Sequence, residues 1–276
     1  MQAPFSQTDY LKLRSIIKQA GKAVLTYWRE SGLEAGAIDY KSDGTPLSLA
    51  DRKAHDLIKK GLEAFMPDIP VISEEDESQA PQHLNALRFF LVDPVDGTRE
   101  FIKGRKEFTI NIALCEKGTP VFGLVYAPAL DKLWVGDVLA KKAWLEAGGS
   151  TQLLPLPMKR SLEEGLVVVA SASHGNKEAL EHFLKGRKIA RLVNKGSSLK
   201  LCMVASGEAD LYPRQGPTMF WDTAAAHAVV LAAGGYVKSL NAEGHAGADL
   251  CYRDSSLRNP WFLVGRGCFA SYNTCV

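Results

Sequence analysis

The sequence predicts an α/β fold of the mixed (α+β) kind, in which helices and strands first form separate runs and later alternate. Three observations predict it. Two amphipathic helical stretches precede residue 66, short apolar runs separated by turn residues fill residues 108–146, and strand and helix patterns alternate after residue 166. Apolar residues recur every three to four positions in a helix, whereas strands show alternation or short continuous runs. With 276 residues, of which 46% are hydrophobic, the chain can bury a sizeable core.

Two amphipathic helices are predicted at the start of the chain. The apolar face of the first consists of Leu13, Ile16, Ile17, Ala20, Val24 and Trp28. Ser6 or Thr8 can cap its N-terminus. The apolar face of the second consists of Ala50, Ala54, Leu57, Ile58, Gly61, Leu62 and Phe65. Asp51 lies in the first turn of this helix, where the helix dipole stabilises a carboxylate, so an ordinary N-terminal charge is one explanation for it.

Two short apolar runs after the helices, residues 70–73 and 89–92, predict buried strands that each end in carboxylates. The first run is followed by Glu74 and Glu75, and the second by Asp93. In an open α/β sheet, ligands bind where neighbouring strands end. Aspartate and glutamate oxygens favour Mg²⁺ or Mn²⁺ over zinc. The two strand ends therefore predict a site for a hard cation.

The motif that opens with Asp93 is predicted to be a turn. Pro94 and Gly97 favour a chain reversal, after which Asp93 and Asp96 can face one point and Thr98 adds a hydroxyl. Taken singly, the motifs have structural explanations, because Asp-Gly is a common turn dipeptide and Glu-Glu-Asp is usually a solvated surface run.

A further carboxylate follows far downstream, in the pair Trp221-Asp222. A helix is predicted over residues 222–233, ended by Gly234 and Gly235. Asp222 could simply cap this helix. In combination with the two upstream strand ends, however, a metal site is favoured, because buried carboxylates are unstable without a cation or a hydrogen-bond donor.

Between these motifs, apolar runs separated by turn residues predict a mostly antiparallel meander. The runs are residues 108–115, 121–127, 133–138 and 143–146. Residues 166–170 and 209–212 predict later strands, with a helix over residues 199–205 between them.

The segment at about residues 153–164 resembles a connection between two halves. We therefore expect an N-terminal half, residues 1–152, that carries most candidate metal ligands, and a C-terminal half, residues 153–276, that carries Asp222 and the candidate substrate-binding residues. The two halves are expected to pack closely as one catalytic unit.

Composition excludes several classes of protein. With 33 Lys and Arg against 31 Asp and Glu, the net charge of +2 gives no global field of the kind that binds a nucleic acid polymer. Five cysteines without a Cys-x-x-Cys pair argue against a disulfide framework or a zinc site. The N-terminus lacks a signal-peptide pattern and no apolar run approaches the length of a membrane span, so the cytoplasm is the expected location.

Together, the motifs at residues 74–75, 93–98 and 221–225, closing at residues 233–235, resemble the signature set of the inositol monophosphatase superfamily of metal-dependent, lithium-sensitive phosphatases. Within it, the chain most resembles the bacterial 3'(2'),5'-bisphosphate nucleotidases of the CysQ type. The residues that carry this second resemblance are 99–103, 107–114, 196–200 and 211–214. The similarity covers about residues 10–264 in the family's order. It implies a layered αβαβα sandwich of the inositol monophosphatase and sugar phosphatase type.

The resemblance also implies a set of metal ligands and catalytic groups. Two or three Mg²⁺ ions, with Mn²⁺ as an alternative, would be held by Glu74, Asp93, Asp96, Asp222 and the backbone carbonyl of Val95. Asp51 and Thr98 would orient and deprotonate the attacking water, and Glu75 would support them from outside the direct ligands. His227, on the helix that follows Asp222, is expected to pack or to line the substrate rather than to act as a base.

The candidate substrate-binding residues share an ability to hold a second phosphate through hydroxyl, imidazole, backbone N–H or cationic groups. They are Gly97, Ser171, Ser173, His174, Ser197, Ser198, Lys200 and Arg214. The serines could instead be helix caps, and Lys200 a solvated lysine. Inositol monophosphatases typically place an acidic residue shortly before Trp-Asp, but residues 214–218 supply none, and an arginine suits a phosphate better than a polyol.

We therefore expect a Mg²⁺-dependent phosphatase that removes the 3'-phosphate of 3'-phosphoadenosine 5'-phosphate to give AMP. An inositol or sugar phosphatase on the same site is the first alternative. A non-catalytic regulator that binds metal or nucleotide is the second, and the intact set of Asp51, Thr98 and carboxylates speaks against it. The expected partner is a small-molecule bisphosphate nucleotide, and the protein is expected to be a monomer or homodimer. Peripheral association with the inner membrane, which occurs in relatives, is left open.

Overall fold

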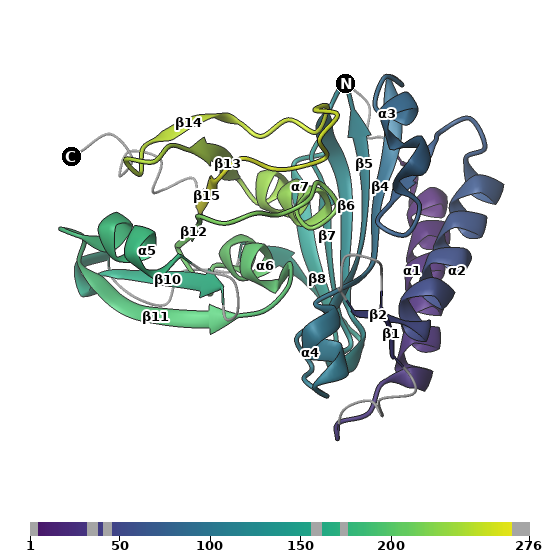
Figure 1. Ribbon diagram of the computed structural model, residues 1–276, viewed down its shortest axis with the longest axis horizontal. Coiled ribbons are helices and arrows are strands. Elements are labelled where there is room, and N and C mark those ends of the chain that lie inside the picture. The colour runs from purple at the N-terminus through teal and green to yellow at the C-terminus, as the bar shows by residue number, and fades with distance from the viewer. Residues whose placement is uncertain (1–4, 32–37, 41–45, 156–161, 172–175, 267–276) are drawn as a thin grey trace.

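The computed structural model describes residues 5–31, 38–40, 46–155, 162–171 and 176–266 (Figure 1). Their elements stack in five layers: a helix pair, a seven-stranded sheet, a second helix pair, a six-stranded sheet and a single helix. This arrangement confirms the predicted αβαβα sandwich.

The outer helix pair consists of α1 (Gln7–Tyr27) and α2 (Leu49–Phe65). Both predicted apolar faces pack on the first sheet in one buried cluster. Ser6 is the N-cap of α1: its hydroxyl accepts from the Asp9 amide, and the Asp9 carboxylate accepts from the Ser6 amide. This reciprocal capping box satisfies two amides that lack partners within the helix. It selects Ser6 over Thr8 among the two predicted caps.

The seven-stranded sheet has the order β3-β4-β5-β6-β7-β8-β9. Strand β3 (Val71–Ser73) is parallel to β4 (Arg88–Asp96), and every later neighbour is antiparallel, which confirms the predicted meander. The meander strands are β5 (Thr109–Glu116), β6 (Thr119–Ala127), β7 (Lys132–Asp137), β8 (Lys142–Ala147) and β9 (Ser150–Leu154). The sequence did not predict β9 because all but its last residue are exposed. The sheet therefore runs to Leu154, beyond the boundary expected at residue 152.

The six-stranded sheet has the order β11-β10-β12-β15-β13-β14 and mixes parallel and antiparallel pairs. Its strands are β10 (Leu166–Ser171), β11 (Ile189–Lys195), β12 (Leu211–Arg214), β13 (Gly235–Leu240), β14 (Ala246–Asp249) and β15 (Phe262–Arg266). Only β10 and β12 were predicted. Helix α5 (Lys177–Leu184), also not predicted, covers the outer face of this sheet through Phe183.

Smaller elements complete the described chain. Strands β1 (Ile38–Tyr40) and β2 (Pro46–Ser48) form an antiparallel pair before α2. The short helices α3 (Ala80–His83) and α4 (Thr98–Ile102) flank β4.

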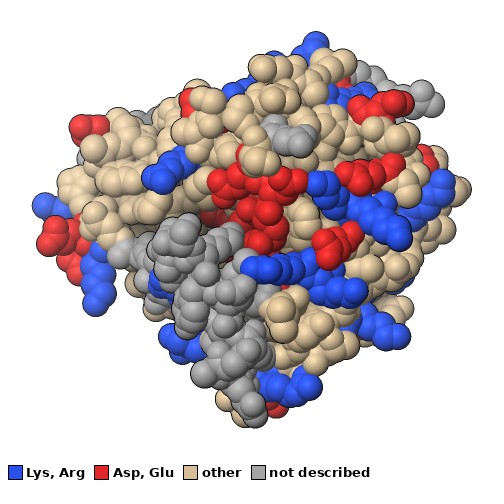
Figure 2. Space-filling view, turned by 45° about the vertical axis from the view of Figure 1, so that its right-hand side comes forward, with Lys and Arg blue, Asp and Glu red and all other residues tan. Residues whose placement is uncertain are grey.

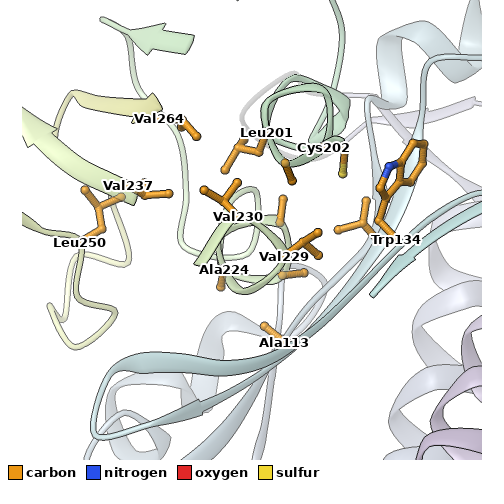
Figure 3. Close-up of a cluster of buried hydrophobic side chains, with 14 of the residues drawn as sticks. Ala113, Trp134, Leu201, Cys202, Ala224, Val229, Val230, Val237, Leu250 and Val264 are labelled. Atoms are coloured by element: carbon orange, nitrogen blue, oxygen red, sulfur yellow. The ribbon is translucent and has the colours of Figure 1, made fainter. Parts of the chain in front are cut away.

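The central helix pair, α6 (Leu199–Ser206) and α7 (Ala224–Ala232), lies between the two sheets (Figures 1 and 3). Helix α7 is built mainly of alanine and valine, and nearly all of it is buried. A Cβ atom on Gly123 of β6 would lie 2.1 Å from the Ala225 carbonyl oxygen, and one on Gly136 of β7 would lie 2.5 Å from the Val229 Cα. The helix backbone therefore rests directly on the sheet.

This contact leads to a stability prediction. Gly123→Ala is expected to lower the free energy of unfolding by about 1–3 kcal/mol or more, because the added methyl group forces the α7 backbone away from the sheet. Urea denaturation measures the change. Thr151→Ala, on the exposed strand β9, is the control and should stay within about 0.5 kcal/mol of wild type. Equal stability of Gly123→Ala and wild type would contradict the close packing.

Candidate active site

A β-bulge places Asp93 and Asp96 on one side of β4. Asp93 pairs with Asn111 and Asp96 pairs with Thr109, so three steps along β4 match two steps along β5. In a regular strand, residues three apart point to opposite faces. The extra residue of the bulge shifts the alternation by one position, so the side chains of Asp93 and Asp96 lie on the same side. The predicted turn at Asp93 is therefore wrong: β4 continues to Asp96, and the chain leaves the strand at Gly97, whose φ is 90°.

Two further carboxylates reach this point from other elements. The Glu74 amide donates to the Val92 carbonyl at 3.2 Å, which places Glu74 beside β4 at the residue that precedes Asp93. Asp222 precedes α7, which begins at Ala224, later than predicted, and the Asp222 carboxylate accepts from the Met219 amide at 2.7 Å. Carboxylate oxygens of Asp93, Asp96 and Asp222 lie within 4.8 Å of one another.

The electrostatics of this carboxylate cluster fit a bound cation. Asp93 is 1% exposed, and its Oδ1 has no hydrogen-bond partner among the described residues. Burial raises the pKa of Asp93 well above its usual range, and the charge of Glu74 and then of the other carboxylates raises it further. Burial, followed by the charges of Asp96 and Glu74, raises the pKa of Asp222 to about 8. A donor set made only of carboxylate oxygens suits Mg²⁺ or Mn²⁺, which would relieve the repulsion.

Asp96 is held by the segment that leads into α6. Its Oδ2 accepts from the Ser198 amide at 2.6 Å, the Ser197 hydroxyl at 2.7 Å and the Ser198 hydroxyl at 2.9 Å. Ser198 is 2% exposed. Ser198 is predicted to bind substrate, but it is not among the residues that line the cavity described next, and its hydroxyl contacts Asp96.

A cavity of about 330 Å³ opens beside the carboxylates. Several predicted site residues line it: Asp51, Glu74, Asp96, Gly97, Thr98, Ser171, Ser197, Lys200, Arg214 and Asp222. The Thr98 hydroxyl donates to the Val95 carbonyl at 3.1 Å, which fixes its direction. Figure 2 shows a face of the molecule on which acidic side chains gather, with lysines and arginines beside them.

Two buried cations share this cavity with the carboxylates. Lys200 and Arg214 are each 7% exposed. The Lys200 ammonium donates to the Ser197 carbonyl at 2.5 Å, and the Arg214 guanidinium donates to the Pro217 carbonyl at 2.9 Å. Burial lowers the pKa of Lys200 to about 8, against the opposing effect of the Asp96 charge. The cavity can therefore receive an anion that carries charge at two places.

Of four other residues singled out in the sequence, two lie away from the cavity lining and two lie outside the described residues. Glu75 is half-buried and does not line the cavity. His227 is buried, contacts the Tyr252 hydroxyl at 3.0 Å and lies away from the cavity lining; burial lowers its pKa to about 3, so it packs as a neutral side chain. Ser173 and His174 lie outside the described residues.

Other cavity residues were not predicted, among them Glu100, Tyr212 and Phe262. The polar residues Thr109 and Asn111 of β5, next to the cluster, were also missed. The sequence pattern could have indicated Thr109 and Asn111, because polar side chains that alternate with apolar ones in a buried strand must form hydrogen bonds inside the protein.

The family of this fold follows from comparison with known proteins. The family model described as the inositol monophosphatase family matches residues 7–264. The chain belongs to the inositol monophosphatase family. This membership confirms the predicted resemblance, and the chain is a phosphatase that hydrolyses phosphate monoesters. Its carboxylate cluster agrees with the metal dependence of that family.

Individual relatives of this inositol monophosphatase family member are similar over nearly the whole chain. The 3'(2'),5'-bisphosphate nucleotidase CysQ of Shigella flexneri is 41% identical over 90% of this chain and 96% of its own length. The protein of the same name from Buchnera aphidicola is 38% identical over 94% of this chain and 92% of its own length. The crystal structure of CysQ from Bacteroides thetaiotaomicron matches with a TM-score of 0.79 and 33% identity, covering 95% of this chain and 98% of that one.

Within the ranges that the structure describes, no helix has the length and apolar character that a transmembrane span requires.

Proposed function

We propose that this phosphatase is a Mg²⁺-dependent 3'(2'),5'-bisphosphate nucleotidase that converts 3'-phosphoadenosine 5'-phosphate to AMP and phosphate. The observation that carries the proposal is the single cavity that holds both the carboxylate cluster and the buried cations Lys200 and Arg214. A substrate with two phosphates can place one at the metal site and the other at the cations. The similarity to proteins named 3'(2'),5'-bisphosphate nucleotidase supports the same substrate.

The proposed metal ligands are the carboxylates of Glu74, Asp93, Asp96 and Asp222 and the carbonyl of Val95, which together would hold two or three Mg²⁺ ions. When bound, Mg²⁺ supplies charge neutralisation at the phosphate and lowers the pKa of water.

The proposed catalytic groups of the chain itself are Asp51 and Thr98. The Asp51 carboxylate, which is 2% exposed and lines the cavity, accepts a proton from the attacking water. The Thr98 hydroxyl, fixed by its bond to the Val95 carbonyl, orients that water. The water oxygen bonds to phosphorus while the bond from phosphorus to the 3'-oxygen breaks, the 3'-oxygen takes up a proton from solvent, and Asp51 then releases its proton to solvent. Glu75 is assigned no direct role, because it does not line the cavity.

A substrate panel tests the proposal against its alternatives. Phosphate release is measured from 3'-phosphoadenosine 5'-phosphate, inositol monophosphate and fructose bisphosphate, each with and without Mg²⁺. We expect the highest kcat/KM with the nucleotide and none without the metal. Preference for inositol monophosphate would instead support an inositol phosphatase, and no hydrolysis of any substrate would support a binding regulator.

The two cations lead to a prediction on substrate preference. Arg214→Gln or Lys200→Gln is expected to lower kcat/KM for 3'-phosphoadenosine 5'-phosphate by about 10- to 150-fold, which corresponds to a lost charge-assisted contact of about 1.5–3 kcal/mol. Adenosine 3'-phosphate lacks the second phosphate and should be affected much less. Steady-state kinetics on both substrates measure the difference. Arg191→Gln, at an exposed position of β11, is the matched control, and equal losses on both substrates would contradict the assignment.

A cytoplasmic location is also part of the proposal. It is supported by Cys115, Cys202 and Cys251, which are free thiols in the described structure. Association with a membrane surface is not part of it.

A further inference from the structure

Strand β5 carries polar side chains on a buried face. Thr109 and Asn111 are 0% and 1% exposed. Side chains alternate along a strand, so both share the face of Ala113, which packs in the core cluster of the central helices, whereas Ile110 and Ile112 pack toward α1 and α2. Polar groups on such a face need internal hydrogen bonds.

Thr109 and Asn111 contact each other (Thr109 hydroxyl to Asn111 Oδ1, 3.1 Å), and each has a donor atom 3.5 Å from Asp96 Oδ2. These two residues, and Glu107 just before β5, also contact residues 195–198, the connection from β11 to α6. The pairs are Glu107 with the Lys195 ammonium (2.8 Å) and the Gly196 amide (3.3 Å), the Thr109 hydroxyl with the Ser197 hydroxyl (2.7 Å), and the Asn111 amide group with the Ser198 hydroxyl (2.9 Å). The connection is thus fixed, residue by residue, to a strand of the other sheet.

This connection has an unfavourable backbone conformation. Ser197 has a φ of 57°, in the left-handed region that few residues other than glycine adopt. Such conformations persist where surrounding contacts determine them, and they gather at functional sites. The hydrogen bonds to Thr109 and Asn111 are contacts of that kind.

This arrangement fixes the position of the Asp96 carboxylate. All three close donors, the hydroxyls of Ser197 and Ser198 and the Ser198 amide, point at Oδ2. A carboxylate oxygen has about two lone pairs, so hydrogen bonds from the protein take up the whole accepting capacity of Oδ2. The Ser198 hydroxyl also lies 2.7 Å from the Asp222 carbonyl oxygen, so its single proton is shared between two acceptors, one on each of two carboxylate-bearing residues of the cluster.

We infer that Thr109, Asn111, Ser197 and Ser198 are positioning residues that hold Asp96 toward the cation site. This inference rests on the proposed metal-dependent function. Ser197 and Ser198 fix the carboxylate through charge-assisted hydrogen bonds to Oδ2, and Thr109 and Asn111 hold the two serines in place, which leaves Oδ1 as the oxygen to be directed to the metal.

A metal titration without substrate tests the inference. Mn²⁺ and Mg²⁺ are titrated calorimetrically into metal-free wild type, Ser198→Ala and Thr109→Val. We expect Ser198→Ala to bind about 10- to 100-fold more weakly, the usual effect of removing a residue that orients a metal ligand, and Thr109→Val to weaken binding in the same direction. Preference for 3'-phosphoadenosine 5'-phosphate over adenosine 3'-phosphate should stay as in wild type, because the contact of Lys200 is with the Ser197 backbone.

Ser206→Ala is the matched control. Ser206 lies on α6, is 1% exposed and accepts a hydrogen bond from the Trp134 indole at 3.0 Å, so its removal also deletes a buried hydroxyl of the same helix. Its metal affinity should equal that of wild type.

Two results would overturn the inference. One is wild-type metal affinity in both Ser198→Ala and Thr109→Val, and the other is an equal loss in Ser206→Ala, which would indicate general destabilisation. If Ser198→Ala does not fold, Thr109→Val decides alone. The titration needs no substrate, so it decides this inference even if nucleotide hydrolysis is not observed.

Discussion

Excess EDTA is expected to abolish phosphate release, and Mg²⁺ is expected to restore it. The reason is the carboxylate cluster: Asp93 is buried, and Glu74, Asp96, Asp222 and Asp51 all add to the cost of ionising it. Without a cation, the carboxylates of the cluster repel one another, and they also repel the negatively charged phosphate of a substrate. Asp93→Asn is expected to weaken metal binding and activity together. Phosphate release at a series of Mg²⁺ concentrations measures both, and full turnover in excess EDTA would overturn metal dependence.

Thermal stability provides an independent check on the same metal. The pKa of Asp222 is about 8 in the metal-free fold, whereas an unfolded aspartate has a pKa of about 4. Between these values the folded state binds more protons than the unfolded state, so this group's contribution to stability is greatest below about pH 4 and is lost as the pH rises through about 8. Mg²⁺ favours the ionised form, so it should raise the melting temperature more at pH 8 than at pH 5. An equal rise at both pH values would contradict this account.

Asp51→Asn is expected to lower kcat by about 10²–10⁴-fold, the scale of a positioned general base, while metal affinity stays close to that of wild type. Asp51 is held in the first turn of α2 and lines the cavity. The amide keeps the shape of the side chain but is not a base. Single-turnover kinetics and a metal titration separate the two effects.

The control for this variant lies on the same helix. Asp56→Asn removes the charge of an exposed aspartate of α2 and should leave kcat unchanged. Wild-type turnover in Asp51→Asn would show that another group accepts the proton.

The elements that the sequence predicted correctly are those whose pattern is local. The faces of α1 and α2 and the meander from β5 to β8 repeat with a fixed period, and that period survives folding. Strands β9 and β14 were missed because they are largely exposed edge strands without an apolar repeat. In these strands, pairing with the neighbouring strand determines the extended conformation, and the sequence pattern does not.

The carboxylate cluster was predicted for a sound reason but with one wrong detail. Glu74 does follow the end of β3, whereas Asp93 lies within the neighbouring strand β4, which continues to Asp96. The bulge that brings Asp96 to them depends on the register with β5, and register is set by pairing, which a single strand does not reveal. The contact of Ser198 with Asp96 joins residues 102 positions apart, so its role became visible only in the fold.

The close packing of α7 against β6 and β7 also has a consequence for folding during synthesis of the chain. The main core cluster combines Ala113 and Trp134 of the first sheet with Val229 of α7 and Val237 of the second sheet (Figure 3). Chains are synthesised from the N-terminus, so the first sheet emerges complete while the helix that covers its inner face is still absent. Until residue 232 has left the ribosome, that apolar face is open to chaperones or to aggregation. The same delay keeps Asp222 from the other carboxylates, so a nascent chain gains its full set of metal-binding carboxylates only when its core closes.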